Sequence, residues 1–125
     1  IVAVGRWSSH LDDVLSKGDV DRLRRFHQEK NRLPEGPRVS AFPYLLGPEM
    51  FGCFAGRRWL HVEASGDVLP CAYMPISFGN VREKSLQEIW REMGRDRWLR
   101  RKAACCMMKD PDFRRAHSFM FEPED

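Results

Sequence analysis

Apolar residues recur at the spacing of an amphipathic helix in two stretches of the chain, the first over residues 18–31. Ser16 and Asp19 form an S-x-x-D start there, and an acidic side chain in the first turn favours the helix dipole. The residues at helical spacing are Val20, Leu23, Phe26 and His27, with charged residues on the opposite face. The pattern predicts a helix with one apolar face.

The second helical stretch covers residues 85–93. Ser85 and Glu88 form a capping box, in which each side chain bonds the backbone N–H of the other residue. An apolar stripe follows at i, i+3, i+4 and i+7, made of Leu86, Ile89, Trp90 and Met93. We therefore expect a helix here, and we expect Trp90 to be a core residue.

Alternating side chains predict a β-hairpin over about residues 58–74. In its first strand Leu60 and Val62 share one face, and Trp59 and His61 share the other. Gly66 lies in the turn, where glycine adopts a positive φ most easily. Pro70 has no N–H to donate, so the return strand lies at an edge or carries a bulge.

Two shorter apolar runs are predicted to be extended. Residues 1–4 indicate a strand that Gly5 ends, and residues 39–46 indicate an irregular extended piece because Pro43 interrupts them. Together the elements predict the α+β class, with a small β-hairpin plus helices.

Composition limits the function classes. With 125 residues and 42% hydrophobic residues, the chain is one domain or one piece of a larger protein, and its core is thin. No apolar run approaches the ~20 residues that span a bilayer, so no membrane partner is expected. Four cysteines are too few for a disulfide-dense secreted scaffold, which favours a reducing, cytoplasmic location.

Positive charge is concentrated in residues 94–117, where eight Lys and Arg residues face three Asp residues. This stretch leaves an alternative function open: a small nucleic-acid-binding module that sets Trp98 against bases and cations against phosphates. The net charge of the whole chain is only +3, which makes a nucleic-acid partner a weaker prediction.

Cysteine spacing points to metal chemistry. Cys53 precedes the predicted hairpin and Cys71 lies on its return strand, so both can converge on one end of the ribbon and hold a soft metal as thiolates. On spacing alone, a buried Cys71 without a metal is the more common outcome. No C-x-x-C clip is present, so a structural zinc module is a second alternative with weaker support. No pair among the four histidines has metal-binding spacing, and His117 would be the least improbable substitute ligand.

The motifs around these cysteines resemble the C-terminal auxiliary-cluster region of radical SAM enzymes, called SPASM or, in its shorter form, twitch. The shared elements occur in the family's order over residues 53–90. They are Cys53, Ala55-Gly56, a strand, Gly66-Asp67, Pro70-Cys71, Gly79-Asn80, and the helix Ser85-Leu86 to Ile89-Trp90. An ordered set of this kind is far more specific than a pair of cysteines.

The resemblance implies that the cysteines bind an auxiliary 4Fe–4S cluster. By position, Cys53 and Cys71 match the first two ligands, and one or both of Cys105 and Cys106 match a ligand supplied after the second helix. Longer SPASM domains have seven cysteines and two clusters, so four cysteines imply the one-cluster form. Adjacent side chains point to different sides of a chain, and we favour Cys106 because Met107-Met108 can form an apolar wall beside it.

The resemblance also implies a domain layout: residues 1–50 are the end of a radical SAM barrel and a linker, 51–117 the auxiliary-cluster domain, and 118–125 a tail. The C-x-x-x-C-x-x-C loop of the catalytic cluster is absent from the sequence, so S-adenosylmethionine would bind in a catalytic part outside it. The implied function is an auxiliary domain of a radical SAM oxidoreductase that supports electron transfer or substrate positioning and is not catalytically complete alone. Its partners would be the rest of its radical SAM domain and a peptide or small-molecule substrate.

Overall fold

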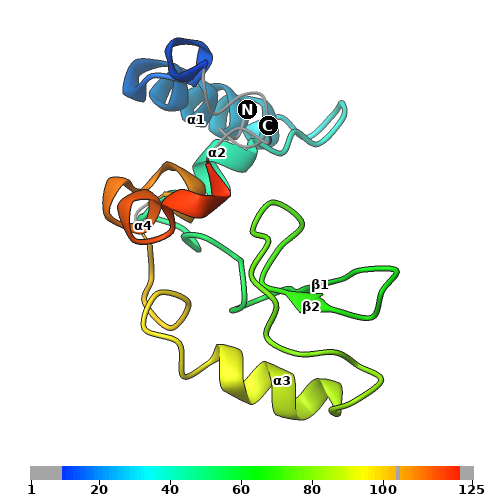
Figure 1. Cartoon of the computed structure of the whole chain (residues 1–125). Helices are drawn as coiled ribbons and strands as arrows, with labels where there is room; N and C mark the ends of the chain where they lie inside the picture. Colours follow the sequence, from blue (N-terminus) through cyan, green and yellow to red (C-terminus); the bar gives the residue numbers. More distant parts are fainter. Residues whose placement is uncertain (1–9, 104, 122–125) are drawn as a thin grey trace.

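The computed structural model describes residues 10–103 and 105–121, so the strand predicted at residues 1–4 lies outside the described residues. Figure 1 shows α1 and α2 at one end of the molecule and α3 at the other, with the hairpin and α4 between them. The elements are η2 (Leu11–Asp13), α1 (Lys17–Arg32), α2 (Phe42–Leu45), β1 (His61–Val62), β2 (Val68–Leu69), α3 (Leu86–Met93), η3 (Met107–Lys109), α4 (Pro111–Ala116) and η4 (Ser118–Met120). Helices with one small antiparallel sheet confirm the α+β class.

Both predicted helix starts are present. In α1, Ser16 Oγ accepts from the Asp19 amide at 3.2 Å, and the Ser16 amide donates to the Asp19 carboxylate at 3.0 Å. In α3, Ser85 and Glu88 make the same reciprocal pair at 3.3 and 3.0 Å. Each box satisfies N–H groups that a helix cannot pair internally, which fixes where the helix begins.

Burial of the two helices differs from the prediction. On α3, Ile89 and Met93 are fully buried, but Trp90 is 36% exposed, so the prediction that Trp90 is a core residue is wrong. On α1 no residue is buried, and Phe26 is 46% exposed. The element that packs on α1 is the four-residue α2, which is too short to cover the whole apolar stripe.

The hairpin forms at the predicted place but is shorter than residues 58–74. His61 pairs with Leu69, and Val62 pairs with Val68. Pro70 follows β2 directly, and its carbonyl accepts from the amide of a residue before β1, so a loop contact replaces the ladder there. The two residues predicted to share one face differ in exposure: Val62 on β1 is 42% exposed, and Leu60 just before β1 is half-buried.

Residues 39–46 are not simply extended, because they contain the helical turn α2. Pro43 lies in the first turn of α2, where the missing N–H would have no helical partner in any case. Proline therefore starts a short helix here instead of interrupting a strand. Among the described residues, no helix combines the length and apolar character that crossing a membrane requires.

One side chain joins the hairpin turn to the segment before α3. Asn80 Nδ2 donates to the Ser65 carbonyl at 3.1 Å and to Asp67 Oδ1 at 3.3 Å, while Asn80 Oδ1 accepts from the Arg82 amide at 3.0 Å. Gly66 has a φ of +95°, and a Cβ there would lie 2.6 Å from Asn80 Oδ1. The Gly-Asn pair therefore holds the Gly-Asp turn through the side chain of Asn80. We call the hydrogen bonds of Asn80 with Ser65 and Asp67 the clamp.

Replacing Asn80 with Ala is expected to lower the free energy of unfolding by about 1–3 kcal/mol, because the half-buried Asp67 and the backbone groups of Ser65 and Arg82 lose their hydrogen bonds to Asn80. Urea denaturation of the chain measures this. Gln87→Ala is the control, since Gln87 is exposed on α3. Equal midpoints for the two variants would show that the clamp contributes nothing to stability.

The core includes Cys53 and is rich in methionine. Met107 and Met108, predicted to form an apolar wall, are both buried in it. Methionine is flexible and fills irregular gaps, which suits a core assembled mostly from loops. The buried cluster contains Cys53, Ala55, Val68, Met74, Ile89, Met93, Leu99, Ala103, Met107, Met108 and Phe113.

Candidate metal centre

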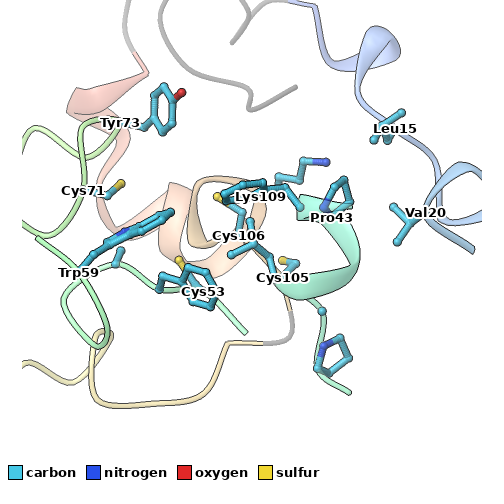
Figure 2. A pocket seen from close by; sticks show the side chains of 16 residues that line it. Leu15, Val20, Pro43, Cys53, Trp59, Cys71, Tyr73, Cys105, Cys106 and Lys109 are labelled. Carbon is cyan, nitrogen blue, oxygen red and sulfur yellow. The ribbon is translucent and has the colours of Figure 1, made fainter. Parts of the chain in front are cut away.

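All four cysteines line one cavity of about 740 Å³. Figure 2 shows the side chains of Cys53, Cys71, Cys105 and Cys106 in its wall, with Leu15 and Val20 at the edge away from Cys71. None of the four forms a disulfide. The structure thus brings together every cysteine that the sequence singled out, including both members of the adjacent pair.

A glycine makes this convergence possible. Gly52 has a φ of +69°, and a Cβ on it would lie 2.6 Å from the carbonyl oxygen of Ala103. The segment before Cys53 therefore packs directly against the backbone that leads to Cys105. Sequence analysis missed this residue, and its only signal was a glycine next to a candidate cysteine.

Cys53 and Cys106 interact directly. The Cys106 thiol donates to Cys53 and is the largest of the effects that lower the pKa of Cys53 to about 6, against the opposing effect of burial. Amides of Met107 and Ala55 and the charge of Arg57 lower this pKa further. The pKa of Cys106 is raised, because its proton is held by Cys53 and its thiol is buried.

Backbone amides point at three of the four sulfurs. Cys53 receives hydrogen bonds from the amides of Met107 and Ala55, Cys71 from those of Tyr73 and Met74, and Cys106 from that of Met108. In each case one donor lies two residues after the cysteine, which places the sulfur in the bend of a tight turn. These N–H groups stabilise thiolates and are the kind that tune iron–sulfur centres.

Cys105 has a different environment. Burial is the largest effect that raises its pKa, and the Asp110 carboxylate adds to it. The nearby cations Lys109 and Arg101 act in the opposite direction. The pKa of Cys105 is shifted by burial and by nearby charges, and no backbone hydrogen bond contributes to the shift. Burial also raises the pKa of Cys71, and it raises that of Cys106 together with the hydrogen bond to Cys53, so what distinguishes Cys105 is that no backbone amide acts on its sulfur.

The donor set fits an iron–sulfur cluster. Soft thiolates around a cavity can ligate a cluster from several sides, whereas a zinc ion needs its donors within about 2.3 Å of one point. Among residues 10–103 and 105–121, no three His, Cys, Asp or Glu side chains are grouped closely enough to bind one metal ion. None of the four histidines lines the cavity, although all four lie in the described part of the chain.

Apart from the four cysteines, the cavity wall is apolar and aromatic, with one cation, Lys109, among its residues. Sequence analysis did not find this part of the site, because α1 and α2 contribute to it from far along the chain. The other lining residues are Leu15, Val20, Phe42, Pro43, Leu46, Gly47, Pro48, Phe54, Ala55, Trp59, Tyr73 and Lys109.

Trp98 in the basic stretch is engaged within the protein. The Arg101 guanidinium lies 4.3 Å from the centre of its ring, and the ring of Phe113 meets it edge-on at 5.5 Å. Arg101 also pairs with Asp110 at 2.7 Å. Trp98 and Arg101, two of the residues invoked for nucleic-acid binding, therefore already have intramolecular partners.

Comparison with known proteins points to the same chemistry. The SPASM family, an iron–sulfur cluster-binding domain, matches residues 53–117. An AdoMet-dependent heme synthase of Methanosarcina barkeri is 41% identical over 56 residues, which cover 45% of this chain and 16% of the relative. The AdoMet-dependent heme synthase of Nitratidesulfovibrio vulgaris is 37% identical over 58 residues, covering 46% of this chain and 16% of the relative.

The matched part of this chain spans only about a sixth of the length of these curated relatives. No solved structure matches the chain. The family match covers more than half of the 125 residues and includes all four cysteines. The chain therefore belongs to the SPASM family of iron–sulfur cluster-binding domains, and its cofactor is an auxiliary iron–sulfur cluster.

Proposed function

We propose that this chain is the auxiliary-cluster domain of a radical SAM oxidoreductase and holds one 4Fe–4S cluster through its cysteines. The observation that carries the proposal is the convergence of all four thiols on one cavity. The four thiols come from three separate segments of the chain. Packing alone does not require cysteine at these positions, because methionine fills irregular gaps in the same core. A shared cofactor supplies a reason for cysteine there.

Cys53, Cys71 and Cys106 are the ligands of this proposal, and Cys105 takes the fourth position. Amide donors at the first three sulfurs act in favour of the thiolate form that iron requires, and at Cys71 and Cys106 they oppose the effect of burial. At Cys105 burial raises the pKa most, the Asp110 carboxylate adds to this, and no amide opposes it. The fourth bond is therefore the weakest and the most readily exchanged for another ligand.

A bound cluster accepts and releases single electrons, and the residues of this chain set the conditions for that exchange. Arg57, Arg101 and Lys109 supply positive charge near the thiolates. The apolar wall keeps water away from the sulfurs and offers a surface to a substrate or a partner domain. These features favour electron transfer as the main role of the domain and substrate positioning as its second role.

The relatives are named AdoMet-dependent heme synthases, so we infer that this domain works beside one that cleaves S-adenosylmethionine. Residues 1–50 would lead from that catalytic part, 51–117 would form the auxiliary domain, and 118–125 would be its tail. The substrate of the parent enzyme would approach the apolar side of the cavity.

Anaerobic reconstitution with iron and sulfide tests the proposal. We expect a brown chain with broad visible absorption and iron and sulfide in equal amounts. A colourless chain with one zinc per molecule would contradict it in favour of a structural zinc module. Tight, salt-dependent binding of an oligonucleotide by a chain that takes up no iron would favour the nucleic-acid alternative.

A further inference from the structure

Most of the cavity wall belongs to residues other than the four cysteines. Of the sixteen described residues that line it, twelve are not cysteine, and eleven of these twelve are uncharged. The volume of about 740 Å³ lies in the range of small-molecule pockets, which is about 300–1,000 Å³. The cavity is therefore built to receive an apolar molecule as well as a metal cofactor.

Three aromatic side chains on the wall are open to solvent. Phe42 is 52% exposed, Trp59 is 43% exposed and Tyr73 is 55% exposed. The rings of Phe42 and Trp59 stack at 6.3 Å with their planes 28° apart, and the ring of Phe54 meets Trp59 edge-on at 5.0 Å. Ring contacts of this kind hold Trp59 in place while part of it stays uncovered. The apolar body of a ligand would cover this surface.

Among the described residues, Lys109 is the one charged residue on the wall. It is the last residue of η3 and is half-buried. In Figure 2 its side chain extends away from Cys71 and toward the side of the cavity that Pro43 and Val20 line. The ammonium group is thus presented to the apolar side of the cavity.

The carboxylate next to Lys109 in the sequence, that of Asp110, is engaged elsewhere. Asp110 Oδ1 accepts from the Asp112 and Phe113 amides at 3.0 Å each, and Oδ2 accepts from Arg101 at 2.7 Å. Within the described part of the chain, no carboxylate forms an ion pair with Lys109. A half-buried cation without an acidic partner, beside apolar surface, can bind the anionic group of a ligand.

We propose that the apolar side of this cavity binds a small carboxylic acid, whose carboxylate pairs with Lys109 and whose apolar body packs against Phe42, Trp59 and Tyr73. One ammonium group balances the single negative charge of a carboxylate, whereas a phosphate group brings about two. This inference rests on the proposed function, in which a substrate approaches this side of the cavity, and it names the chemical class of that substrate. Lys109 acts as a binding residue that selects for the carboxylate.

Two probes of nearly the same shape test the selection. 1-Naphthaleneacetate has an aromatic body and a carboxylate, and 1-naphthaleneacetamide carries a neutral amide in place of the carboxylate. Ligand-observed NMR measures the Kd of each probe for the full chain, with and without the reconstituted cluster. We expect the acid to bind about tenfold more tightly than the amide, which is the contribution of one charge-assisted hydrogen bond.

Variants separate the charge from the apolar wall. Lys109→Met should abolish the preference for the acid without changing the Kd of the amide, whereas Lys109→Arg should keep the preference. Tyr73→Ala should weaken both probes alike, because it removes part of the apolar wall. Lys102→Met is the matched control, since Lys102 is exposed, belongs to the same basic stretch and is not among the described lining residues. If Lys109→Met does not fold, Lys109→Gln replaces it, with the same expected Kd values.

Three results would overturn the inference. The first is an equal Kd of acid and amide for the wild type. The second is a preference for the acid that survives in Lys109→Met, which with a lowered iron content would assign Lys109 to the thiolates instead. The third is a chain that binds neither probe and sediments as a dimer, but as a monomer after Tyr73→Ala, which would assign the apolar wall to a second copy.

Failure of the inference and failure of the proposed function look different. A wild-type chain that takes up no cluster contradicts the function itself. A wild-type chain that takes up a cluster and binds acid and amide equally contradicts only the assignment of a carboxylic acid to the cavity.

Discussion

Cys53→Ala, Cys71→Ala and Cys106→Ala chains are each expected to lose most of their iron after reconstitution, whereas Cys105→Ala keeps most of it. Each of the first three removes a sulfur that accepts hydrogen bonds from backbone amides, which act in favour of the thiolate. No such amide acts on Cys105, whose pKa is raised by burial and by the Asp110 carboxylate. Iron and sulfide per chain, with visible absorption, measure the difference.

The adjacent pair makes this comparison a controlled one. Cys105 and Cys106 share the same segment and both line the cavity, so general disruption would affect both variants alike. If Cys105→Ala loses the cluster and Cys106→Ala keeps it, the assignment of the third ligand is reversed. If neither variant loses iron, the third ligand lies elsewhere, and the positions carried over from the SPASM resemblance are wrong at this end.

Replacing Gly52 with Ala is expected to destabilise the chain and to prevent cluster binding. The left-handed φ costs about 1–2 kcal/mol for a residue with a Cβ. The new Cβ would also lie 2.6 Å from the backbone oxygen of Ala103, which cannot rotate away as a side chain can. Relief of that clash separates the segment of Cys53 from the segment of Cys105, so the thiols no longer surround one site.

Gly36→Ala is the matched control for this prediction. Gly36 also has a positive φ, +101°, but a Cβ there would meet no atom within 4 Å. The Gly36→Ala variant should lose stability only through the cost of the left-handed φ, and its iron binding should be unchanged. Urea unfolding and iron per chain measure both variants. Full iron binding by Gly52→Ala would show that the close approach of the two segments is not needed.

Local signals in the sequence predicted the parts of the fold that local interactions determine. The capping boxes at Ser16 and Ser85 and the turn at Gly66 are made within a few residues of chain, and the structure has all three. The hairpin length and the exposure of Trp90 depend on what packs against them, which no short window contains. Pro43 is compatible with an extended segment and with the first turn of a helix, and in the structure it lies in the first turn of α2.

The candidate site, like the fold, could be predicted from the sequence only where local motifs determine it. Sequence motifs identified the four cysteines, and the family match covers all of them. That both Cys105 and Cys106 face the cavity of Cys53 could not be predicted, because it depends on the contact of Gly52 with Ala103, about fifty positions apart along the chain. The choice of Cys106 over Cys105 as a ligand stays a prediction, now with the amide donors as its physical basis.

We propose that this chain holds one 4Fe–4S cluster by itself. Native mass spectrometry of the anaerobically reconstituted chain tests it most directly, because it weighs the intact complex. We expect one added mass equal to a single 4Fe–4S cluster per chain, absent from the Cys53→Ala variant. A chain that carries zinc only, or a cluster shared between two chains, would contradict it.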